Sequence, residues 1–211
     1  KSNVTIIDIS PEPEPEPEPE PITVFTDISD NSIYVNISGE LTSQDYINDI
    51  SGNHIKNVVI GDTVTSIGNY TFENCDRLLS VTIPNSVTSI GTQAFDNCNA
   101  LQSVTIPDSV TSINFYAFRY CYALQSVTIG DSVTSIGNNA FQSCSALQSV
   151  TIPDSVTSIG TNAFYGCSSL TDVYLTSTTA ATLGVNFGSN RTFFGKAGVT
   201  IVSYVPEPEP E

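Results

Sequence analysis

The chain has 211 residues, and with 39% hydrophobic residues it is long enough to bury a core of its own. Its net charge of −16, from 22 Asp and Glu against 6 Lys and Arg, argues against nucleic acid and anionic membranes as partners, because both attract clustered cations. No apolar run is long enough to cross a bilayer, so we expect no membrane insertion of this fragment.

The first ten residues resemble a segment near the other end of the chain. Residues 1–11 read KSNVTIIDISP and residues 196–206 read KAGVTIVSYVP, and both lead into Pro-Glu repeats. We therefore interpret residues 1–10 as the tail strand of a preceding copy of the same module, and the parent protein as a tandem array. The absence of Met agrees with a piece of a longer chain.

Two Pro-Glu runs, residues 11–21 and 206–211, carry 8 of the 22 acidic residues. Proline fixes φ and like charges repel, so we predict a linker at 11–21 in extended polyproline II at about 3.1 Å per residue. Residues 206–211 are interpreted as the start of the next linker. The remaining 14 acidic residues against 6 basic ones give a net charge of −8, which is ordinary for a soluble surface.

Residues 22–57 are predicted to form an N-terminal hairpin and a capping repeat. The segments 22–28 and 32–38 are rich in β-branched residues and flank an Asp-Asn turn. Leu41 falls 23 residues before Val64, so we align the residues after Leu41 with the repeat that follows and interpret them as a degenerate copy. The letters TSQD that come next are typical of a helix start, so we expect a short capping helix there.

Residues 58–175 contain five copies of a 23-residue unit that reads LxxVxIPxSVTSIGxxAFxxCxx. Four columns keep this step without exception: Cys75, Cys98, Cys121, Cys144 and Cys167; Phe72, Phe95, Phe118, Phe141 and Phe164; Ile67, Ile90, Ile113, Ile136 and Ile159; Leu78, Leu101, Leu124, Leu147 and Leu170. One such unit cannot bury its own apolar face, whereas stacked units turn each apolar position into a continuous ladder. The period therefore predicts a repeat solenoid.

The local pattern inside one unit predicts its elements. Residues 104–106 alternate and are β-branched, which favours a short strand, and residues 107–109 are a turn signal. Val110 and Ile113 are expected to point inward on a second extended segment. Residues 117–121 place Ala, Phe and Cys at a spacing that fits a single helical or 3₁₀ turn.

The string SVTIPDSVTSI at residues 103–113, followed by Ala117, Phe118 and Cys121, resembles the BspA-type leucine-rich repeat, and the resemblance covers residues 58–175. It implies a leucine-rich repeat right-handed superhelix, β-rich with short helical or 3₁₀ turns and with a parallel sheet on its concave face. It also implies a surface-exposed protein of bacteria or protists, often an adhesive one.

Residues 176–205 are predicted to form a C-terminal cap, because the last repeat of a solenoid has an open end that must be covered. Residues 177–184 look helical, and residues 199–205 look like a terminal strand.

The sequence offers no differentiated cluster of polar residues of the kind an active site needs, so we expect no enzymatic activity and no cofactor. The single histidine, His54, has no obvious partner in the sequence and is interpreted as a loop residue. There is no phosphate loop, dinucleotide fingerprint or nucleophile elbow.

Two ladders of possible metal ligands have a structural interpretation that we prefer. The five cysteines are odd in number and form no CxxC pair, so we predict buried free thiols rather than disulfides or a metal site. An acidic ladder could bind Ca²⁺, but we favour side chains that hydrogen-bond the backbone of their own turn, because one of its members is an Asn. Its members are Asp62, Asn85, Asp108, Asp131 and Asp154.

Ser and Thr make up 51 residues of the chain, and those in the predicted strands alternate with inward Val and Ile. The outward pairs are Ser80/Thr82, Ser103/Thr105, Ser126/Thr128 and Ser149/Thr151. They predict a hydroxyl lattice with about 4.8 Å between strands and about 6.7 Å along each strand. A regular lattice of this kind could order water, so ice binding is one alternative function. A merely soluble strand face is the other interpretation.

The third full repeat departs from the others at its variable positions. It carries Phe115, Tyr116, Arg119, Tyr120 and Tyr122, where most repeats hold Asn, Thr, Ser or Gln. Because Phe118 and Cys121 are expected to face inward, we expect Arg119 and Tyr120 to face outward. Tyr and Arg are enriched in binding hot spots, so these five residues are the candidate binding site. Related positions on nearby repeats hold Tyr70, Arg77 and Tyr165.

These observations predict a non-enzymatic recognition or adhesion module that binds a protein or glycan partner. We expect a monomeric module, one unit of a tandem array, at the cell surface or outside the cell, with any signal and anchor beyond this fragment. The alternative is an inert structural spacer or stalk.

Overall fold

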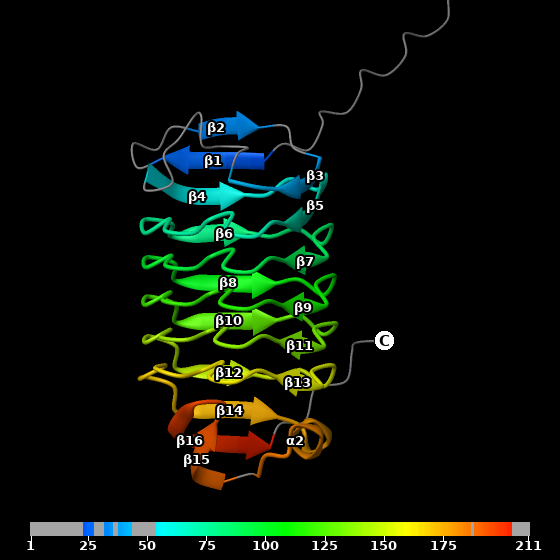
Figure 1. The fold of residues 1–211 in the computed structure, drawn as a ribbon, viewed down its shortest axis with the longest axis vertical. Helices are drawn as coiled ribbons and strands as arrows, with labels where there is room; N and C mark the ends of the chain where they lie inside the picture. The colour runs from blue at the N-terminus through cyan, green and yellow to red at the C-terminus, as the bar shows by residue number, and fades with distance from the viewer. Residues whose placement is uncertain (1–22, 28–31, 36–37, 44–53, 187, 204–211) are drawn as a thin grey trace, which may run out of the picture.

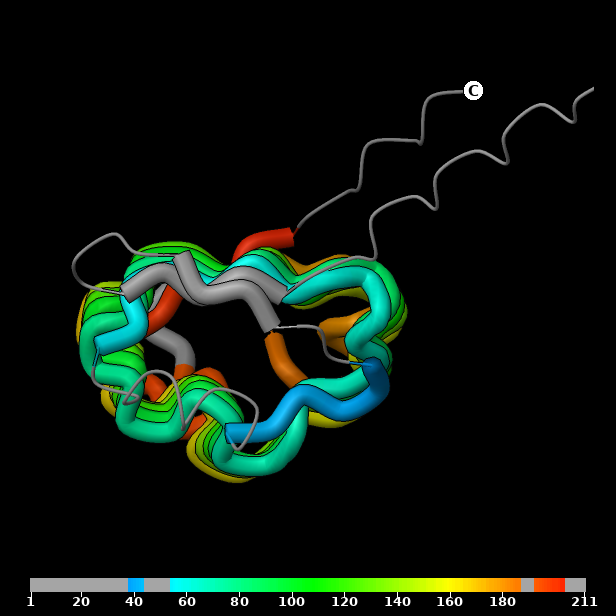
Figure 2. The backbone as a smooth tube through the Cα atoms, turned by 90° about the horizontal axis from the view of Figure 1, so that it is seen from above, coloured from blue at the N-terminus to red at the C-terminus, as the bar shows by residue number. Residues whose placement is uncertain are grey.

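The computed structural model describes residues 23–27, 32–35, 38–43, 54–186 and 188–203. These residues form a β-solenoid whose rungs stack in chain order, with one short helix near the C-terminal end (Figure 1). Seen along the long axis, the rungs superpose on one another, so the column is nearly straight (Figure 2). The expected tail strand 1–10, both linkers and the capping helix lie outside the described residues.

Two stacks of strands run along the column. The first consists of β4 (Ile55–Val59), β6 (Ser80–Thr82), β8 (Ser103–Ile106), β10 (Ser126–Ile129), β12 (Ser149–Thr151) and β14 (Asp172–Leu175). The second consists of β3 (Gly39–Leu41), β5 (Val64–Ile67), β7 (Ser89–Ile90), β9 (Ser112–Ile113), β11 (Ser135–Ile136) and β13 (Ser158–Ile159). Neighbouring strands in the second stack are parallel, as are the pairs β4–β6, β8–β10 and β12–β14 in the first.

The register of these pairs equals the sequence period. Val104 of β8 pairs with Val127 of β10, and Ile113 of β9 pairs with Ile136 of β11. Each residue therefore lies beside its own counterpart on the next rung. Because strand side chains alternate between faces, the Val and Ile of β8 and β10 are buried and the Ser and Thr between them lie outside.

The core is a set of ladders inside the column. Five phenylalanines stack face to face, with ring centroids 5.1–5.5 Å apart and planes within 16° of parallel. Cysteine, leucine and alanine ladders run beside them and are equally buried. At the C-terminal end the ring of Phe193 lies 5.4 Å from that of Phe164 and closes the phenylalanine ladder.

The segment expected as a helical or 3₁₀ turn is a run of tight turns that also joins the rungs. In the third repeat the N–H groups of Ala117 and Arg119 each donate to the carbonyl three residues earlier. The N–H groups of Tyr116, Phe118 and Tyr120 donate instead to carbonyls of the next rung, at 2.8–3.2 Å. The backbone is left-handed at Tyr116 and Tyr120, which interrupts the turns, so the segment is not a continuous 3₁₀ helix.

The N-terminal end is covered by a hairpin. β1 (Thr23–Asp27) pairs antiparallel with both β2 (Ser32–Val35) and β4. Next to it, our alignment of Leu41 with Val64 is wrong, because Leu41 pairs with Ile67. The register shifts at Gly39, which lets Leu41 extend the inward isoleucine ladder.

The C-terminal cap contains a helix and two strands. α2 (Ser177–Leu183) begins after Thr176, whose side chain accepts a hydrogen bond from the Thr179 N–H, and ends at Gly184 in a left-handed conformation with φ 67°. β16 (Lys196–Ser203) pairs with β14 and starts three residues earlier than expected. β15 (Gly188–Phe193), antiparallel to β16, was not expected, because its GSNRTF sequence lacks an alternating apolar pattern.

The phenylalanine ladder predicts that replacing either of two nearby phenylalanines by alanine has very different effects on stability. Phe118→Ala, in a fully buried site between two stacked rings, should lower the free energy of unfolding by about 3–5 kcal/mol. Phe115→Ala, at a residue that is 39% exposed, should change it by less than about 1 kcal/mol. Urea unfolding followed by circular dichroism measures both, and equal losses would contradict the ladder as the source of stability.

Candidate functional site

The turn segment of the third repeat brings the five expected residues together on the surface. The rings of Phe115 and Tyr116 are 3.7 Å apart between centroids, and those of Tyr120 and Tyr122 are 5.8 Å apart. The guanidinium of Arg119 lies between the two pairs, 4.0 Å from the Tyr116 centroid and 4.9 Å from that of Tyr120. We call these five residues the aromatic patch. Cation–π contacts at these distances hold Arg119 and the two tyrosines together.

We expected Arg119 to face outward, but its side chain does not extend freely into solvent. Its side chain is only 22% exposed, because Nε donates to Asp96 Oδ1 at 2.9 Å and Nη2 donates to Asp96 Oδ2. Asp96 itself is buried on the preceding rung. The hydrogen bonds to Asp96 raise the pKa of Arg119, which stays charged. Phe115 and Tyr122 are the exposed members of the patch, and Tyr116 and Tyr120 are half-buried.

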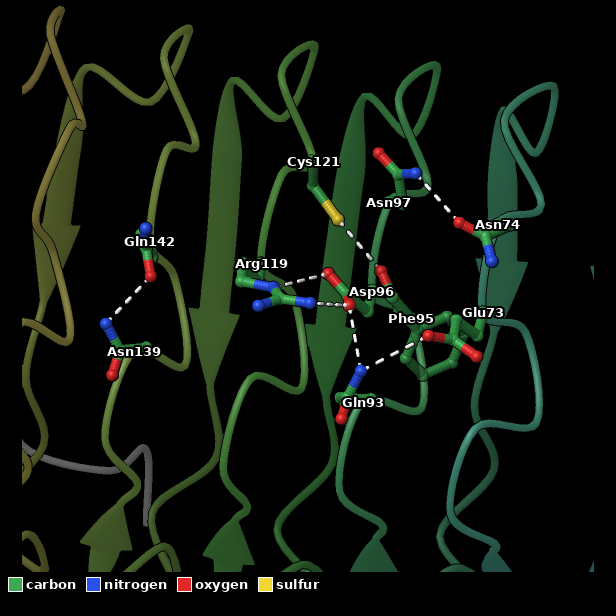
Figure 3. Close-up of polar contacts among 10 residues, drawn as sticks. All are labelled: Glu73, Asn74, Gln93, Phe95, Asp96, Asn97, Arg119, Cys121, Asn139 and Gln142. Carbon is green, nitrogen blue, oxygen red and sulfur yellow. Dashed lines mark hydrogen bonds and ion pairs between the residues drawn. The ribbon is translucent and has the colours of Figure 1, made fainter.

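Asp96, the partner of Arg119, is itself held by polar side chains of its own rung and of the rung before it. Gln93 Nε2 donates to Asp96 Oδ2 at 3.1 Å and to Glu73 Oε1 at 3.2 Å, so the network spans three rungs (Figure 3). Sequence reasoning missed Asp96 and Gln93. A signal was present, because Asp96 precedes Arg119 by one repeat period and carries the opposite charge.

Two patch tyrosines adopt a backbone conformation that aromatic residues rarely take. Tyr116 has φ 57° and Tyr120 has φ 59°, both in the left-handed region. The equivalent residues of other rungs are Gln93, Asn139 and Asn162 for the first position, and Asn74, Asn97, Ser143 and Gly166 for the second. Among the equivalents of Tyr116, only Tyr70 is also aromatic. The left-handed conformation is therefore a feature of the repeat, and backbone preference does not explain tyrosine at these two positions.

The other aromatic candidates lie apart from the patch. Tyr70 is 48% exposed in the column of Tyr116, and Tyr165 is 54% exposed in the column of Arg119. Each is two rungs from the patch, a distance of about 10 Å along the column. The structure therefore concentrates the aromatic residues on the third repeat, with isolated tyrosines on either side.

The cysteines offer no reactive group, as the sequence predicted. All five are free and buried. The thiols of Cys98, Cys121, Cys144 and Cys167 each donate to a phenylalanine carbonyl of the preceding rung at 3.1–3.3 Å. Burial raises the pKa of Cys98, Cys121 and Cys144, which keeps these thiols protonated and poor as nucleophiles or metal ligands.

The acidic ladder bonds differently from our expectation. Asp108 Oδ1 accepts from the N–H of Asp131 on the next rung at 2.7 Å, and Asp154 Oδ1 accepts from Thr179 Oγ1 at 2.5 Å. For these two residues the predicted bond to their own turn is wrong, since the next rung or the cap supplies a closer donor. Among the described residues, no group of three or more His, Cys, Asp or Glu side chains is placed to hold a metal. His54 is exposed next to β4.

The family described as BspA type leucine rich repeat region matches residues 48–171 in 6 copies. No curated protein matches the sequence. No helix in the described part of the chain has the length and hydropathy needed to cross a membrane.

Two solved leucine-rich repeat structures share this architecture. A leucine-rich repeat protein of T. pallidum is 35% identical, over 56% of this chain and 58% of its own, with a TM-score of 0.55. One from Bacteroides ovatus is 28% identical, over 74% of this chain and 46% of its own, with a TM-score of 0.54. A leucine rich cell surface protein from Faecalibacterium prausnitzii is 29% identical, over 73% and 52%, with a TM-score of 0.48. The chain thus spans about half the length of these relatives.

The buried thiols predict loss of stability at alkaline pH. In the unfolded chain a cysteine ionises near its ordinary pKa of about 8.5, whereas the folded thiols with raised pKa stay protonated. Their contribution to stability is fully present below pH 8.5 and is lost as the pH rises towards the folded pKa values.

Urea unfolding between pH 7 and 10 should therefore show a falling free energy of unfolding. A variant with Cys98→Ala, Cys121→Ala and Cys144→Ala should lose less over the same range. Identical pH slopes for the two proteins would show that the thiols are not responsible.

Proposed function

Because the chain belongs to the BspA-type leucine-rich repeat family, we propose that it is a non-enzymatic recognition module that binds a protein or glycan partner through the aromatic patch. A site at the cell surface or outside the cell fits this role.

The observation that carries the proposal is the preorganised aromatic patch on one rung of a uniform column. Tyr and Arg are the residues most often found as binding hot spots. Here the two tyrosines and Arg119 are already held in place by Asp96 and by ring contacts. A partner therefore loses little free energy to the ordering of these side chains.

The two Pro-Glu runs, which the sequence predicts to be stiff linkers, favour a multivalent use of such a module. Stiff spacers hold copies of a site apart and raise avidity above the affinity of a single site. An inert stalk is the competing function. It gives no reason for tyrosine at left-handed positions, where asparagine would destabilise the fold less.

Substituting both tyrosines by the residue of neighbouring rungs tests the proposal. Tyr116→Asn with Tyr120→Asn should weaken partner binding at least about tenfold. Stability should stay unchanged or rise, because Asn tolerates the left-handed backbone better than Tyr. Binding is measured on panels of matrix proteins and glycans, with thermal unfolding alongside.

Tyr70→Asn is the matched control, because it makes the same change at the same rung position and φ, two rungs away. It should leave binding intact. If the double variant binds as well as the unchanged protein, the patch is not the site. If the unchanged protein binds nothing in either panel, the stalk function is favoured.

A second candidate function follows from the hydroxyls on the first strand stack. Among the described residues, Ser103, Thr105, Ser126, Thr128, Ser149 and Thr151 are exposed, and their hydroxyls have no hydrogen-bond partner in the protein. The equivalent hydroxyl of Ser80 donates to Asn57 Oδ1 at 2.7 Å. On the other stack the Thr88, Thr134 and Thr157 hydroxyls donate to the preceding rung at 3.1–3.2 Å. The strands of the first stack lie one above another along the column (Figure 1), so these exposed hydroxyls form a regular lattice that faces water. Ordered water on ice is the ligand that matches such a lattice.

Ice binding predicts thermal hysteresis from the purified chain. Thr105→Lys with Thr128→Lys should abolish it, because two charged side chains interrupt the lattice. Thr111→Lys, at an exposed threonine beside the second stack, should preserve it. A freezing point equal to the melting point for the unchanged protein would eliminate this candidate.

A further inference from the structure

We infer that the ligand of the aromatic patch is a short, uncharged glycan, and that Asp96 is the positioning residue that keeps the site electrically neutral. The inference rests on the proposed function, namely that the patch binds a partner, and it assigns the chemistry of that partner.

The extent of the patch favours a small ligand. A stable protein–protein interface buries about 800 Å² on each partner and involves roughly 20–30 residues of each. The aromatic residues here are confined to one rung, and the same positions on the two flanking rungs hold short polar residues such as Gln93, Asn97 and Asn139. A few sugar rings fit a surface of this size.

The charge of the patch is cancelled from inside the protein. Asp96 accepts two hydrogen bonds from Arg119, and the guanidinium lies against both tyrosine rings. Only 22% of the Arg119 side chain remains exposed, so little of its charge is offered to an anionic ligand. The chain around it is acidic, which also repels anions. Recognition must therefore come from ring faces and neutral hydrogen bonds.

Neutral hydrogen-bonding groups lie next to the rings. Asn139 Nδ2 donates to Gln142 Oε1 at 2.7 Å on the rung that follows Arg119 (Figure 3). This leaves Asn139 Oδ1 and Gln142 Nε2 without a partner among the described residues, and both side chains are half-buried. Together with the phenol groups they offer donors and acceptors at the edge of an aromatic surface. Sugar rings match this combination, because they present apolar C–H faces and hydroxyls that both donate and accept.

The test compares neutral and sulfated oligosaccharides on a glycan array, followed by titration calorimetry of the full chain at low and high salt. The unchanged protein should bind neutral glycans with an affinity that changes less than about twofold between the two salt concentrations, because no net charge is involved. Tyr116→Asn with Tyr120→Asn should weaken that binding at least about tenfold, and Tyr70→Asn should not.

Asp96→Asn provides the readout that a merely structural role would not give. The substitution keeps the shape of the side chain but removes the carboxylate charge that neutralises the guanidinium of Arg119. The variant should bind neutral glycans more weakly and should gain affinity for sulfated glycans, a gain that high salt removes. If this variant does not fold, the double variant Asp96→Asn with Arg119→Gln replaces it. The pair is again neutral, and Gln is the residue that the next rung holds at the position of Arg119, namely Gln142. That double variant should bind neutral glycans weakly and sulfated glycans not at all.

Three outcomes would overturn the inference. The first is a preference of the unchanged protein for sulfated glycans with steep salt dependence. The second is protein binding that needs Tyr116 and Tyr120 without any glycan binding, which would leave the proposed function standing. The third is glycan or protein binding that is indifferent to both tyrosines, which would overturn the proposed function as well.

Discussion

The structure depends on one constraint: each buried side chain must pack against its own counterpart on the next rung, about 5 Å away. The phenylalanine ladder shows this directly, with near-parallel rings at 5.1–5.5 Å. Because a rung has no core of its own, the stability of the column resides in contacts between rungs. The same stacking places backbone N–H groups opposite carbonyls of the neighbouring rung, and it aligns Asp96 with Arg119.

The constraint explains where variation is tolerated and why it matters. Inward positions are fixed by the ladders, so the chain can differ between rungs only at outward and turn positions. The third repeat uses this freedom for aromatic residues, and it does so at two positions whose left-handed backbone favours asparagine or glycine. A rung that departs from its neighbours at an energetic cost, while its core stays unchanged, is where recognition is most reasonably sought.

The parts of the fold that were predictable from sequence are those set by the period. The strands, the inward Val and Ile, the buried thiols and the helix before Gly184 all follow from repeated or local patterns. The misses lie where the repeat ends or where rungs interact. The pairing of Leu41 with Ile67 depends on a register shift, and β15 is held by pairing rather than by its own pattern. The sequence singled out the five residues that meet on the third repeat, but it did not reveal Asp96, because that contact forms across the interface between two rungs.

The antiparallel strand at the C-terminal end limits how copies of this module can assemble. Phe193 of β15 ends the aromatic ladder, and β15 occupies the outer edge of its sheet in the direction opposite to the rungs. The place beyond β16 is taken by β15, which runs opposite to the rungs, so the parallel pairing that builds the column stops at β16. In a tandem array each copy would then behave as a separate mechanical element. Under a pulling force such a chain would unfold one copy at a time, and the copies that are still folded would keep their surfaces intact.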